Sequence, residues 1–294
     1  MAILIDGKKV AEEIKLELSL KVSDLKANGK TLPGLVAILV GDDPASHVYV
    51  NSKSKACAQV GFISKIENLD DRISEEALID RIKYYNDHND YHGILVQFPL
   101  PNGINEKNVI EAIDKKKDVD GFHPESVGNL VIGNDSFFPC TPYGIVELLL
   151  RYKIETEGKH VVIVGRSNIV GKPIANLLLQ KRKGANAIVT ICHSAADDLT
   201  KYTLQADILI AAIGKPNFIR GNMVKENAVV IDVGINRVED KNSKKGYKII
   251  GDVNFDEVEK KCSYITPVPG GVGPMTIAML LENTYKAYIN LTKN

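Results

Sequence analysis

Short apolar runs, bounded by Gly or Pro, alternate along the chain with longer segments of helical periodicity. The apolar runs are rich in Val, Ile and Leu, which is typical of strands buried on both faces of a parallel sheet. They begin at Gly34, Gly93, His160, Ala187, Ala206 and Ala228. The segments between them predict helices over residues 10–28, 48–60, 75–86 and 172–180, which supply the crossovers that parallel strands require. The pattern therefore predicts an α/β fold.

The length of 294 residues allows two domains, each with its own core. The tripeptide C-T-P at 140–142 interrupts the pattern before a helical segment at 143–152, and a long amphipathic segment at 275–290 ends the chain. We predict a first domain of residues 1–142 plus 275–294 and a second of residues 143–274, with the final helix packing back on the first domain. The polar stretch 239–246 predicts an exposed hairpin loop.

Composition removes several classes of function. The 37 basic and 37 acidic side chains balance, which gives no electrostatic footprint for nucleic acid or an anionic membrane. The four cysteines lie far apart without a C-x-x-C pair, so their spacing predicts neither a metal site nor disulfides. No run approaches the ~20 apolar residues that span a bilayer, and the N-terminus lacks the apolar core of a signal peptide. We expect a cytoplasmic protein with reduced, buried thiols.

The run from His160 to Gly165 leads into G-R-S-N-I-V-G-K-P at 165–173 and then into a predicted helix. A strand, a glycine turn and a helix N-terminus present backbone N–H groups and the positive end of a helix dipole to a pyrophosphate. The pattern is G-x-S-x-x-x-G rather than G-x-G-x-x-G, so an ordinary strand-to-helix turn is an open alternative.

The end of the next predicted strand bears on the choice of cofactor. NAD-specific Rossmann folds place an acidic residue there, whereas this chain has His193 and Ser194. No carboxylate repels a 2′-phosphate, and Arg166 and Ser194 can donate hydrogen bonds to it, which favours NADP over NAD. The alternative is that Arg166 is a solvated surface residue and that Ser194 caps the helix that follows.

Tyr49 and Lys53 are four residues apart in a predicted helix, which puts both side chains on one face. Burial beside a tyrosine can lower the pKa of a lysine, which suits proton transfer. The same spacing occurs by chance and in short-chain dehydrogenases. Gln97 stands at the carboxyl end of a predicted strand, where α/β sheets place ligands, although it could equally satisfy loop backbone.

Two further stretches carry candidate chemistry. Asp118 and Asp120 point the same way in an extended segment, and they suit either a metal or the N–H edge of an aminopyrimidine, or else an Asx turn. With no further oxygen ligands nearby we prefer the aminopyrimidine and expect no metal. The glycine- and proline-rich run 267–276 forms a rigid wall that a flat ligand can approach closely, or a stiff connector between domains.

Taken together, these segments form an ordered set of motifs. They are Y-V-N-S-K-S-K-A, G-I-L-V-Q-F-P-L-P, K-D-V-D-G-F, P-C-T-P-Y-G, V-G-R-S-N-I-V-G-K-P, D-V-G-I-N and P-V-P-G-G-V-G-P-M-T. The chain closely resembles the bifunctional methylenetetrahydrofolate dehydrogenase/cyclohydrolase family from about Leu4 to the final helix. The resemblance implies two α/β domains around a cleft, the second of Rossmann type, and assembly as a homodimer.

The resemblance also assigns roles to individual residues. The lysine that matches Lys53 is the central group of the cyclohydrolase step, the tyrosine that matches Tyr49 positions substrate, and the glutamine that matches Gln97 tunes the lysine. The aspartate that matches Asp120 holds the pterin ring. The implied cofactor contacts are Gly165, Arg166, Ser167, Ser194 and Ile235. The remaining implied folate contacts are Val96, Phe98, Pro269, Gly270, Gly271, Val272, Gly273, Pro274, Met275, Thr276 and Ile277.

The implied activity is oxidation of 5,10-methylenetetrahydrofolate with NADP, followed by hydrolysis of the methenyl product to 10-formyltetrahydrofolate, in the one-carbon metabolism that serves purine biosynthesis. Three alternatives stay open. A short-chain ketoreductase would use Tyr49 and Lys53, but there the motif follows the nucleotide turn, whereas here it precedes it. A silent dinucleotide-binding scaffold conflicts with the intact set of polar residues. A dehydrogenase with little cyclohydrolase activity is not distinguished by sequence.

Overall fold

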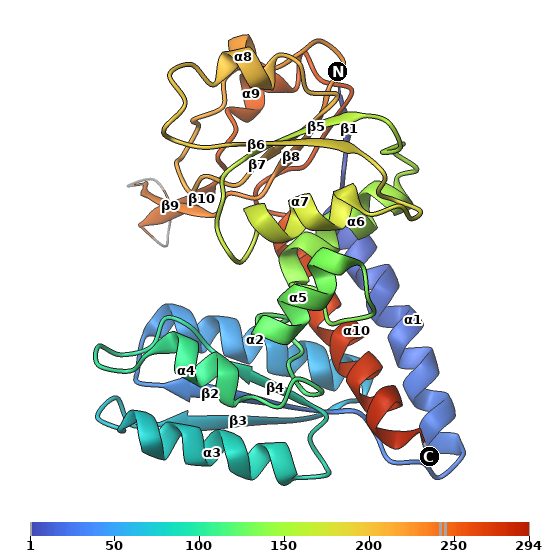
Figure 1. The fold of residues 1–294 in the computed structure, drawn as a ribbon, viewed down its shortest axis with the longest axis vertical. Coiled ribbons are helices and arrows are strands. Elements are labelled where there is room, and N and C mark those ends of the chain that lie inside the picture. Colours follow the sequence, from blue (N-terminus) through green and yellow to red (C-terminus); the bar gives the residue numbers. More distant parts are fainter. Residues whose placement is uncertain (1, 241–242, 244–245, 294) are drawn as a thin grey trace. The chain divides into compact units, whose positions relative to one another are not determined.

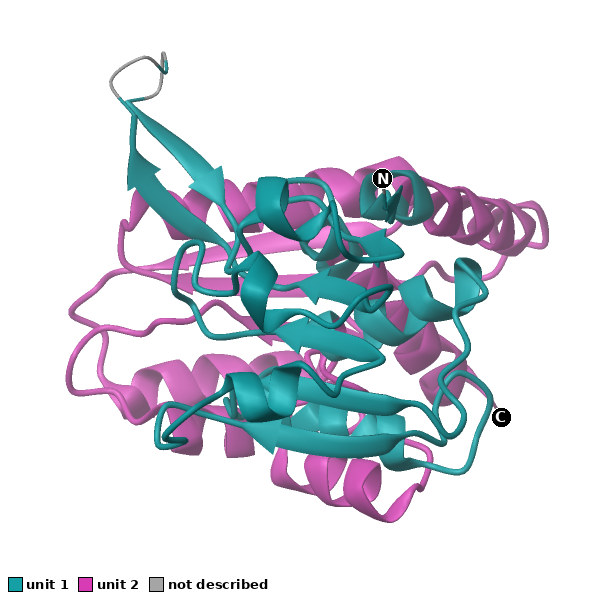
Figure 2. Cartoon of the chain, turned by 90° about the horizontal axis from the view of Figure 1, so that it is seen from above, with its two compact units in different colours: residues 1–11, 141–276 teal, residues 12–140, 277–294 magenta. Residues whose placement is uncertain are grey.

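The computed structural model describes residues 2–240, 243 and 246–293. Its contacts divide the chain into two compact units (Figure 2). Unit 1 comprises residues 1–11 and 141–276, and unit 2 comprises residues 12–140 and 277–294. The division falls inside two long helices, α1 (Gly7–Ala27) and α10 (Val272–Thr292).

Unit 2 is built on a three-stranded parallel sheet in the order β3-β2-β4 (Figure 1). The strands are β2 (Gly34–Val40), β3 (Ile63–Leu69) and β4 (Gly93–Val96). Helices α3 (Glu75–Asp87) and α4 (Glu106–Ala112) pack on the face formed by residues such as Val36 and Ile38, and α2 (Pro44–Val60) lies on the opposite side of the sheet. Asp118 forms an isolated bridge with Ile94 of β4, and helix α5 (Pro124–Ile132) follows it in the chain.

Unit 1 is built on a six-stranded sheet in the order β1-β11-β8-β7-β5-β6, and every pair in it is parallel. The strands are β1 (Ile3–Leu4), β5 (His160–Val164), β6 (Ile188–Cys192), β7 (Ile208–Ala211), β8 (Val229–Asp232) and β11 (Tyr264–Ile265). The order from β6 to β11 is that of a Rossmann sheet without its third strand, so the topological switch point lies between β5 and β7. The predicted Rossmann-type α/β fold is confirmed.

The helices of unit 1 cover both faces of this sheet (Figure 1). Helices α6 (Cys140–Arg151) and α7 (Gly171–Leu179) lie on one face, and α8 (Thr200–Thr203) and α9 (Phe255–Val258) on the other, with the short 3₁₀ helix η1 (Gly221–Met223) beside α8. Alternate strand residues, including Val162, Leu209 and Val230, form one buried cluster on the side of α8 and α9.

The N-terminal residues depart from the predicted domain boundary. We predicted residues 1–11 in the first domain, but β1 pairs with β11, and the backbone N–H of Asp6 donates to the hydroxyl of Tyr152 at 2.7 Å. These bonds place the segment in unit 1. A two-residue strand gives too short an apolar run to be recognised in the sequence.

An antiparallel hairpin extends unit 1, formed by β9 (Asn236–Glu239) and β10 (Tyr247–Ile250). The guanidinium of Arg237 lies 3.7 Å from the ring centroid of Tyr247 and fastens the two strands together. The predicted hairpin loop at 239–246 lies between these strands, and its residues 241, 242, 244 and 245 lie outside the described residues.

Four helices begin three or four residues earlier than predicted; one of them is α1, which begins at Gly7 rather than at residue 10. The other three share a cause. We expected starts at residues 48, 143 and 275, whereas α2 begins at Pro44, α6 at Cys140 and α10 at Val272. Each has a proline in its first turn, where the missing N–H has no acceptor within the helix and costs nothing. Asp43 caps α2 by accepting the N–H of Ser46 at 2.8 Å. The other predicted helices and all six predicted strands are confirmed.

The four cysteines are free, and their predicted burial is confirmed. Among the described residues, no helix is both long enough and apolar enough to cross a membrane.

The predicted packing of the C-terminal helix on the first domain is confirmed, and one buried side chain anchors it. The amide of Asn283 in α10, which is 2% exposed, donates to the carbonyl of Val119 at 2.8 Å and to that of Phe138 at 2.9 Å. These carbonyls belong to two different loops of unit 2. Asn283 therefore ties both loops to the helix.

Replacing Asn283 with leucine keeps the volume but removes the amide that donates to both loop carbonyls. We expect Asn283→Leu to lower the free energy of unfolding by about 2–4 kcal/mol in urea titrations. Asn290→Ala, at an exposed position of the same helix, is the control and should change it by less than about 0.5 kcal/mol. Equal effects of the two variants would contradict the anchoring role.

Candidate active site

Helix α2 places Tyr49 and Lys53 on one face, as their spacing predicted. The side chain of Lys53 is buried, with the residue 7% exposed, and its Nζ lies 5.2 Å from the ring centroid of Tyr49. Desolvation, and then the negative charge of Asp120, raise the pKa of Tyr49, so its hydroxyl stays protonated at neutral pH. The pair thus presents an amine beside an uncharged aromatic ring.

Gln97, directly after β4, contacts the amine of Lys53. Its N–H donates to the carbonyl of Ile38 at 2.9 Å, which continues the sheet ladder one residue beyond Val96. Its Nε2 donates to the carbonyl of Phe98 at 2.7 Å, and its Oε1 accepts from Lys53 Nζ at 3.0 Å. Because the amide nitrogen is committed to Phe98, the oxygen is directed at the amine. Lys53 and Gln97, 44 residues apart, form one unit.

The two carboxylates of the K-D-V-D-G-F segment have different uses. Asp118, 2% exposed, accepts the N–H of His123 at 2.9 Å, the hydroxyl of Ser126 at 2.8 Å and the N–H of Phe122 at 3.3 Å. It closes its own loop, but not as the Asx turn that we left open, because its donors lie four to eight residues further on rather than two. Asp120 has no such backbone donors among the described residues and stays available to a ligand.

The pKa of Asp120 is set by burial and by two charged neighbours of opposite sign. Burial raises its pKa to about 6, the positive charge of Lys53 opposes this rise, and the negative charge of Asp118 adds to it. The sulfur of Cys140 lies 3.8 Å from its Oδ1, and burial and the Asp120 charge hold the pKa of that thiol well above its usual value. The Cys140 sulfur is thus a protonated, weak donor to the carboxylate. From the sequence we predicted for Cys140 only a reduced, buried thiol.

In unit 1 the glycine turn after β5 leaves no room for side chains. A Cβ on Gly165, whose φ is +131°, would lie 2.1 Å from the carbonyl oxygen of Ala212, and one on Gly171 would lie 2.2 Å from the carbonyl oxygen of Gly165. Ser167 Oγ accepts the N–H of Val170 at 3.1 Å at the start of α7. The turn therefore has the close-packed backbone that a pyrophosphate requires.

The remaining predicted cofactor residues are exposed around this turn. Arg166 and Ser194 lie on the surface, and Ile235 is 57% exposed. The helix-cap alternative for Ser194 is wrong: the next helix, α8, begins at Thr200, where the N–H is accepted by Asp198 at 2.9 Å. Ser194 follows the carboxyl end of β6, and its side chain does not cap a helix.

Two buried aspartates that we did not predict organise the neighbouring loops of unit 1. Asp232, 4% exposed, ends β8, and Asp252, 0% exposed, follows β10. Burial raises the pKa of Asp232 to about 6. Their burial could have been predicted from the sequence, because each aspartate lies beside an apolar run and a glycine, in D-V-G-I-N and in G-D-V.

The glycine- and proline-rich run forms a turn that leads into α10. A Cβ on Gly7 would lie 1.9 Å from the carbonyl oxygen of Gly271, so the turn sits directly against the first residue of α1. Thr276 pairs with Thr141 through their hydroxyls at 2.9 Å. Residues Pro269, Gly270 and Gly271 precede the helix, and the predicted contacts from Val272 to Ile277 occupy its first turns.

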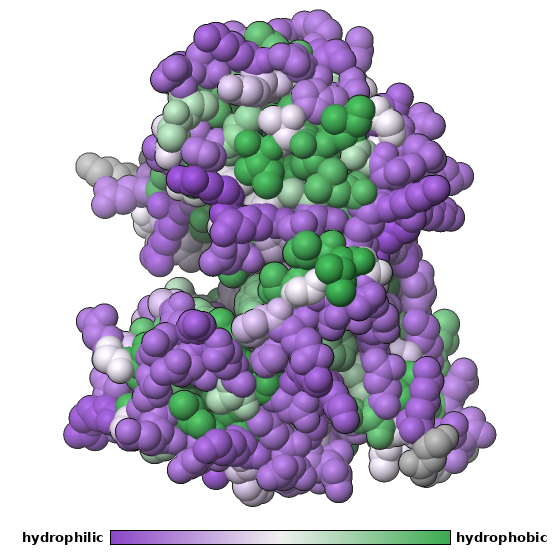
Figure 3. All heavy atoms as spheres, in the orientation of Figure 1, coloured by the Kyte–Doolittle hydropathy of each residue, from purple (hydrophilic) through white to green (hydrophobic). Residues whose placement is uncertain are grey.

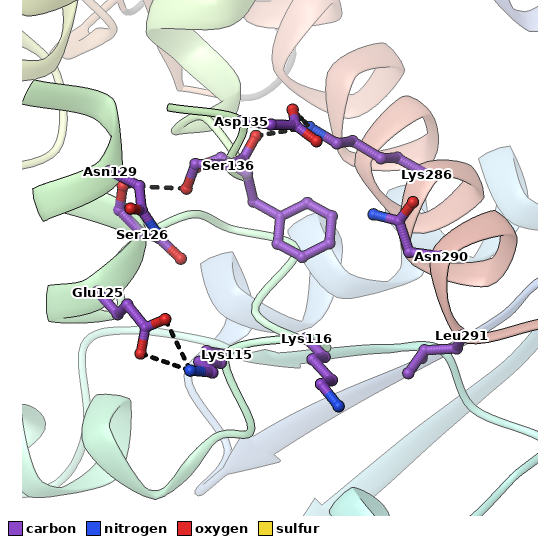
Figure 4. Close-up of a pocket in the computed structure, with 11 residues that line it drawn as sticks. Lys115, Lys116, Glu125, Ser126, Asn129, Asp135, Ser136, Lys286, Asn290 and Leu291 are labelled. Atoms are coloured by element: carbon purple, nitrogen blue, oxygen red, sulfur yellow. Dashed lines mark hydrogen bonds and ion pairs between the residues drawn. The ribbon is translucent and has the colours of Figure 1, made fainter. Parts of the chain in front are cut away.

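A cavity of about 380 Å³ lies elsewhere in unit 2 (Figure 4). Its charged groups are largely paired with one another, since Lys115 contacts Glu125 at 2.7 Å and Lys286 contacts Asp135. Among the described residues, none of the predicted site residues lines it. Nor do any three His, Cys, Asp or Glu side chains of the described chain form a group that could hold a metal.

Two family models match the chain. The catalytic-domain model of tetrahydrofolate dehydrogenase/cyclohydrolase matches residues 5–120, and the NAD(P)-binding-domain model matches residues 139–292. A relative from Prosthecochloris aestuarii, bifunctional protein FolD, is 58% identical over 287 residues, which cover 97% of each chain. The chain belongs to the tetrahydrofolate dehydrogenase/cyclohydrolase family.

Solved structures of this family have the same fold. The bifunctional enzyme FolD from Campylobacter jejuni is 50% identical, with a TM-score of 0.93 over 99% of this chain and 100% of that one. The dehydrogenase-cyclohydrolase from Trypanosoma brucei, solved with NADP and an inhibitor, is 38% identical, with a TM-score of 0.94 over 100% of this chain and 99% of that one. The predicted family, the two predicted activities and NADP as cofactor are confirmed.

The raised pKa of Asp120 makes stability depend on pH in this member of the family. The folded pKa of about 6 lies above the usual 3.8, so ionisation costs stability at neutral pH, and that stability returns as the pH falls from about 6 toward 3.8. We expect Asp120→Asn to raise the free energy of unfolding near pH 7.5 by about 1–2 kcal/mol, since Asp120 keeps some exposure.

Urea titrations from about pH 7.5 to about pH 4 measure this effect, and the difference between Asp120→Asn and the wild type should vanish at the acidic end. Asp135→Asn, at an exposed position, is the control and should stay within about 0.5 kcal/mol throughout. A variant that is less stable than wild type at neutral pH would show that Asp120 stabilises the fold.

Proposed function

We propose that Tyr49, Lys53, Gln97 and Asp120 of unit 2 bind the folate, with the hydrolytic step at Lys53, and that unit 1 binds NADP at the Gly165 turn. The chain oxidises 5,10-methylenetetrahydrofolate to the 5,10-methenyl form and hydrolyses that product to 10-formyltetrahydrofolate. The observation that carries this assignment is the 3.0 Å contact between Lys53 Nζ and Gln97 Oε1 in a buried setting beside Asp120.

The turn after β5 fits a dinucleotide. Gly165 and Gly171 leave the backbone open to a pyrophosphate, and the two residues directly after β6 are His193 and Ser194 rather than a carboxylate that would repel a 2′-phosphate. We assign the 2′-phosphate to Arg166 and Ser194, the pyrophosphate to the turn from Gly165 to Ser167, and a nonpolar cofactor contact to Ile235. Bound NADP supplies a hydride acceptor for the one-carbon bridge of the folate.

Asp120 is suited to hold the aminopyrimidine edge of the pterin. Above its pKa of about 6 the carboxylate is ionised, and it can accept two N–H groups of the ring. Asp118 cannot compete for the ring, because its oxygens are occupied by its own loop. We propose that Val96, Phe98 and residues 269–277 also contact the folate, as the family resemblance implies.

In the hydrolytic step a water oxygen bonds to the methenyl carbon, and the bond from that carbon to one ring nitrogen then breaks. A proton must leave the water and reach the departing nitrogen. Lys53 is suited to move this proton, because Gln97 Oε1 fixes its amine in place and the Tyr49 ring covers it. This arrangement argues against a dehydrogenase with little cyclohydrolase activity.

The role of Lys53 is tested with supplied 5,10-methenyltetrahydrofolate. We expect Lys53→Gln to lower the rate of hydrolysis by about 100-fold or more, since it removes the group that transfers the proton. Lys55→Gln, at an exposed position of the same helix, should hydrolyse at the wild-type rate. Near-wild-type hydrolysis by Lys53→Gln would remove Lys53 from the mechanism.

We further propose that the enzyme is a cytoplasmic homodimer and that its 10-formyl product serves purine biosynthesis. The edge of the unit 1 sheet supports a dimer. Strand β6 pairs only with β5 among the described residues, and its Ile188 and Ile191 are 62% and 40% exposed. Figure 3 shows apolar side chains gathered on the face of unit 1 near this strand. An exposed, uncharged edge strand can pair with a second copy about a two-fold axis.

Light scattering coupled to size exclusion tests the dimer. The expected mass is twice the 32.2 kDa of one chain, and Ile191→Lys should shift it to one chain mass by placing a charge on the edge. Ile132→Lys, on the exposed part of α5 in unit 2, should leave the dimer intact. A wild-type mass of one chain would contradict the proposal.

A further inference from the structure

Asp252 gathers the loop that follows β7. Its Oδ2 accepts the N–H of Ile213 at 2.6 Å and of Gly214 at 2.9 Å, and its Oδ1 accepts the N–H of Lys215 at 2.9 Å. Three consecutive backbone donors therefore converge on one carboxylate that is fully buried. A loop directed inward in this way cannot rearrange without leaving donors, or the charge itself, without partners.

This loop leaves the sheet at the switch point. Strand β7 lies beside β5, and the residue before the gathered loop is Ala212, whose carbonyl oxygen lies where a Cβ on Gly165 would be. The position of Ala212 thus defines the wall against which the glycine turn packs. Because Asp252 fixes residues 213–215, it also fixes the position of the Ala212 carbonyl against which the glycine turn packs.

The same carboxylate reaches the loop after β8. Asp252 Oδ1 accepts from Asn236 Nδ2 at 2.9 Å, and Asn236 directly follows Ile235. Asp252 therefore links the two loops that lie at the carboxyl ends of β7 and β8, where a dinucleotide binds in a parallel sheet of this topology.

The carboxylate of Asp232 fixes the backbone around Asp252. Asp232 Oδ1 accepts the N–H of Asp252 and of Gly234, both at 2.9 Å, and its Oδ2 accepts the N–H of Val253 at 3.0 Å. A Cβ on Gly251 would lie 1.8 Å from Asp232 Oδ2, and one on Gly234 would lie 2.3 Å from Asp252 Oδ1. Glycine backbone packs directly against both carboxylates, so neither has space to shift.

We propose that Asp252 is a positioning residue for NADP: through the loop after β7 it sets the glycine turn, and through Asn236 it sets Ile235. The inference rests on the cofactor site proposed above for unit 1. A contact that merely stabilised the fold would affect both activities, whereas Asp252 in this role affects the dehydrogenase step alone. Hydrolysis of the methenyl substrate needs no NADP and is assigned to unit 2.

The test is Asp252→Asn, which keeps the shape but presents an amide N–H to backbone N–H donors. We expect the KM for NADP to rise about tenfold or more, kcat to change less, and hydrolysis of supplied 5,10-methenyltetrahydrofolate to stay within about twofold of wild type. Fluorescence titration with NADPH should show a matching loss of affinity.

The matched control is Asp207→Asn. Asp207 precedes β7 at the opposite end of the same strand and accepts the N–H of His160 at 2.9 Å. This variant should leave the KM for NADP unchanged. The proposal is overturned if Asp252→Asn changes that KM no more than Asp207→Asn does, or if both activities of a folded Asp252→Asn protein fall together.

If Asp252→Asn does not fold, Asn236→Ala takes its place, because it removes one donor and leaves the three backbone donors to Asp252. It should raise the KM for NADP about threefold with hydrolysis unchanged, and an unchanged KM would overturn the proposal. A wild-type protein that fails to reduce NADP would instead refute the cofactor site of unit 1.

Discussion

Parallel strands end at one edge of their sheet, and the loops that leave this edge carry backbone N–H groups that need acceptors in a dry environment. Buried aspartates meet this need in both units. Asp118 closes the loop that carries Asp120, and Asp232 and Asp252 gather the loops after β7 and β8. Each carboxylate collects several donors at once, which fixes a loop more firmly than neutral hydrogen bonds would.

With the loops held by these groups, Asp120, which we propose for the folate, keeps its carboxylate free of backbone donors among the described residues. Asp120 stands two residues from Asp118 but lacks its backbone donors, so its pKa rises to about 6 and its carboxylate stays open to a ligand. Lys53 is buried, and its amine donates to the amide oxygen of Gln97. Such groups reduce stability and gain reactivity, which is the balance expected of a site rather than of a core.

The sequence predicted the architecture where the apolar pattern was strong and failed where it was weak. The six predicted strands are dominated by aliphatic residues, whereas β3 was missed because I-S-K-I-E-N-L mixes charges into a sheet edge. Helical spacing predicted that Tyr49 and Lys53 share a face. The contact of Lys53 with Gln97 and the hydrogen bonds from the loop after β7 to Asp252 depend on tertiary packing across tens of residues, which no local pattern encodes. The donors to Asp118 lie four to eight residues further on, but the sequence does not tell which of the two aspartates receives them.

We propose that oxidation uses NADP bound in unit 1 and that hydrolysis takes place at Lys53 in unit 2 of one chain. The most direct test follows NADPH, the methenyl intermediate and 10-formyltetrahydrofolate together, by absorbance and chromatography, after wild-type protein receives 5,10-methylenetetrahydrofolate and NADP. We predict that 10-formyltetrahydrofolate accumulates in step with NADPH while the methenyl form stays low. Accumulation of the methenyl form in step with NADPH would contradict the hydrolytic role assigned to unit 2.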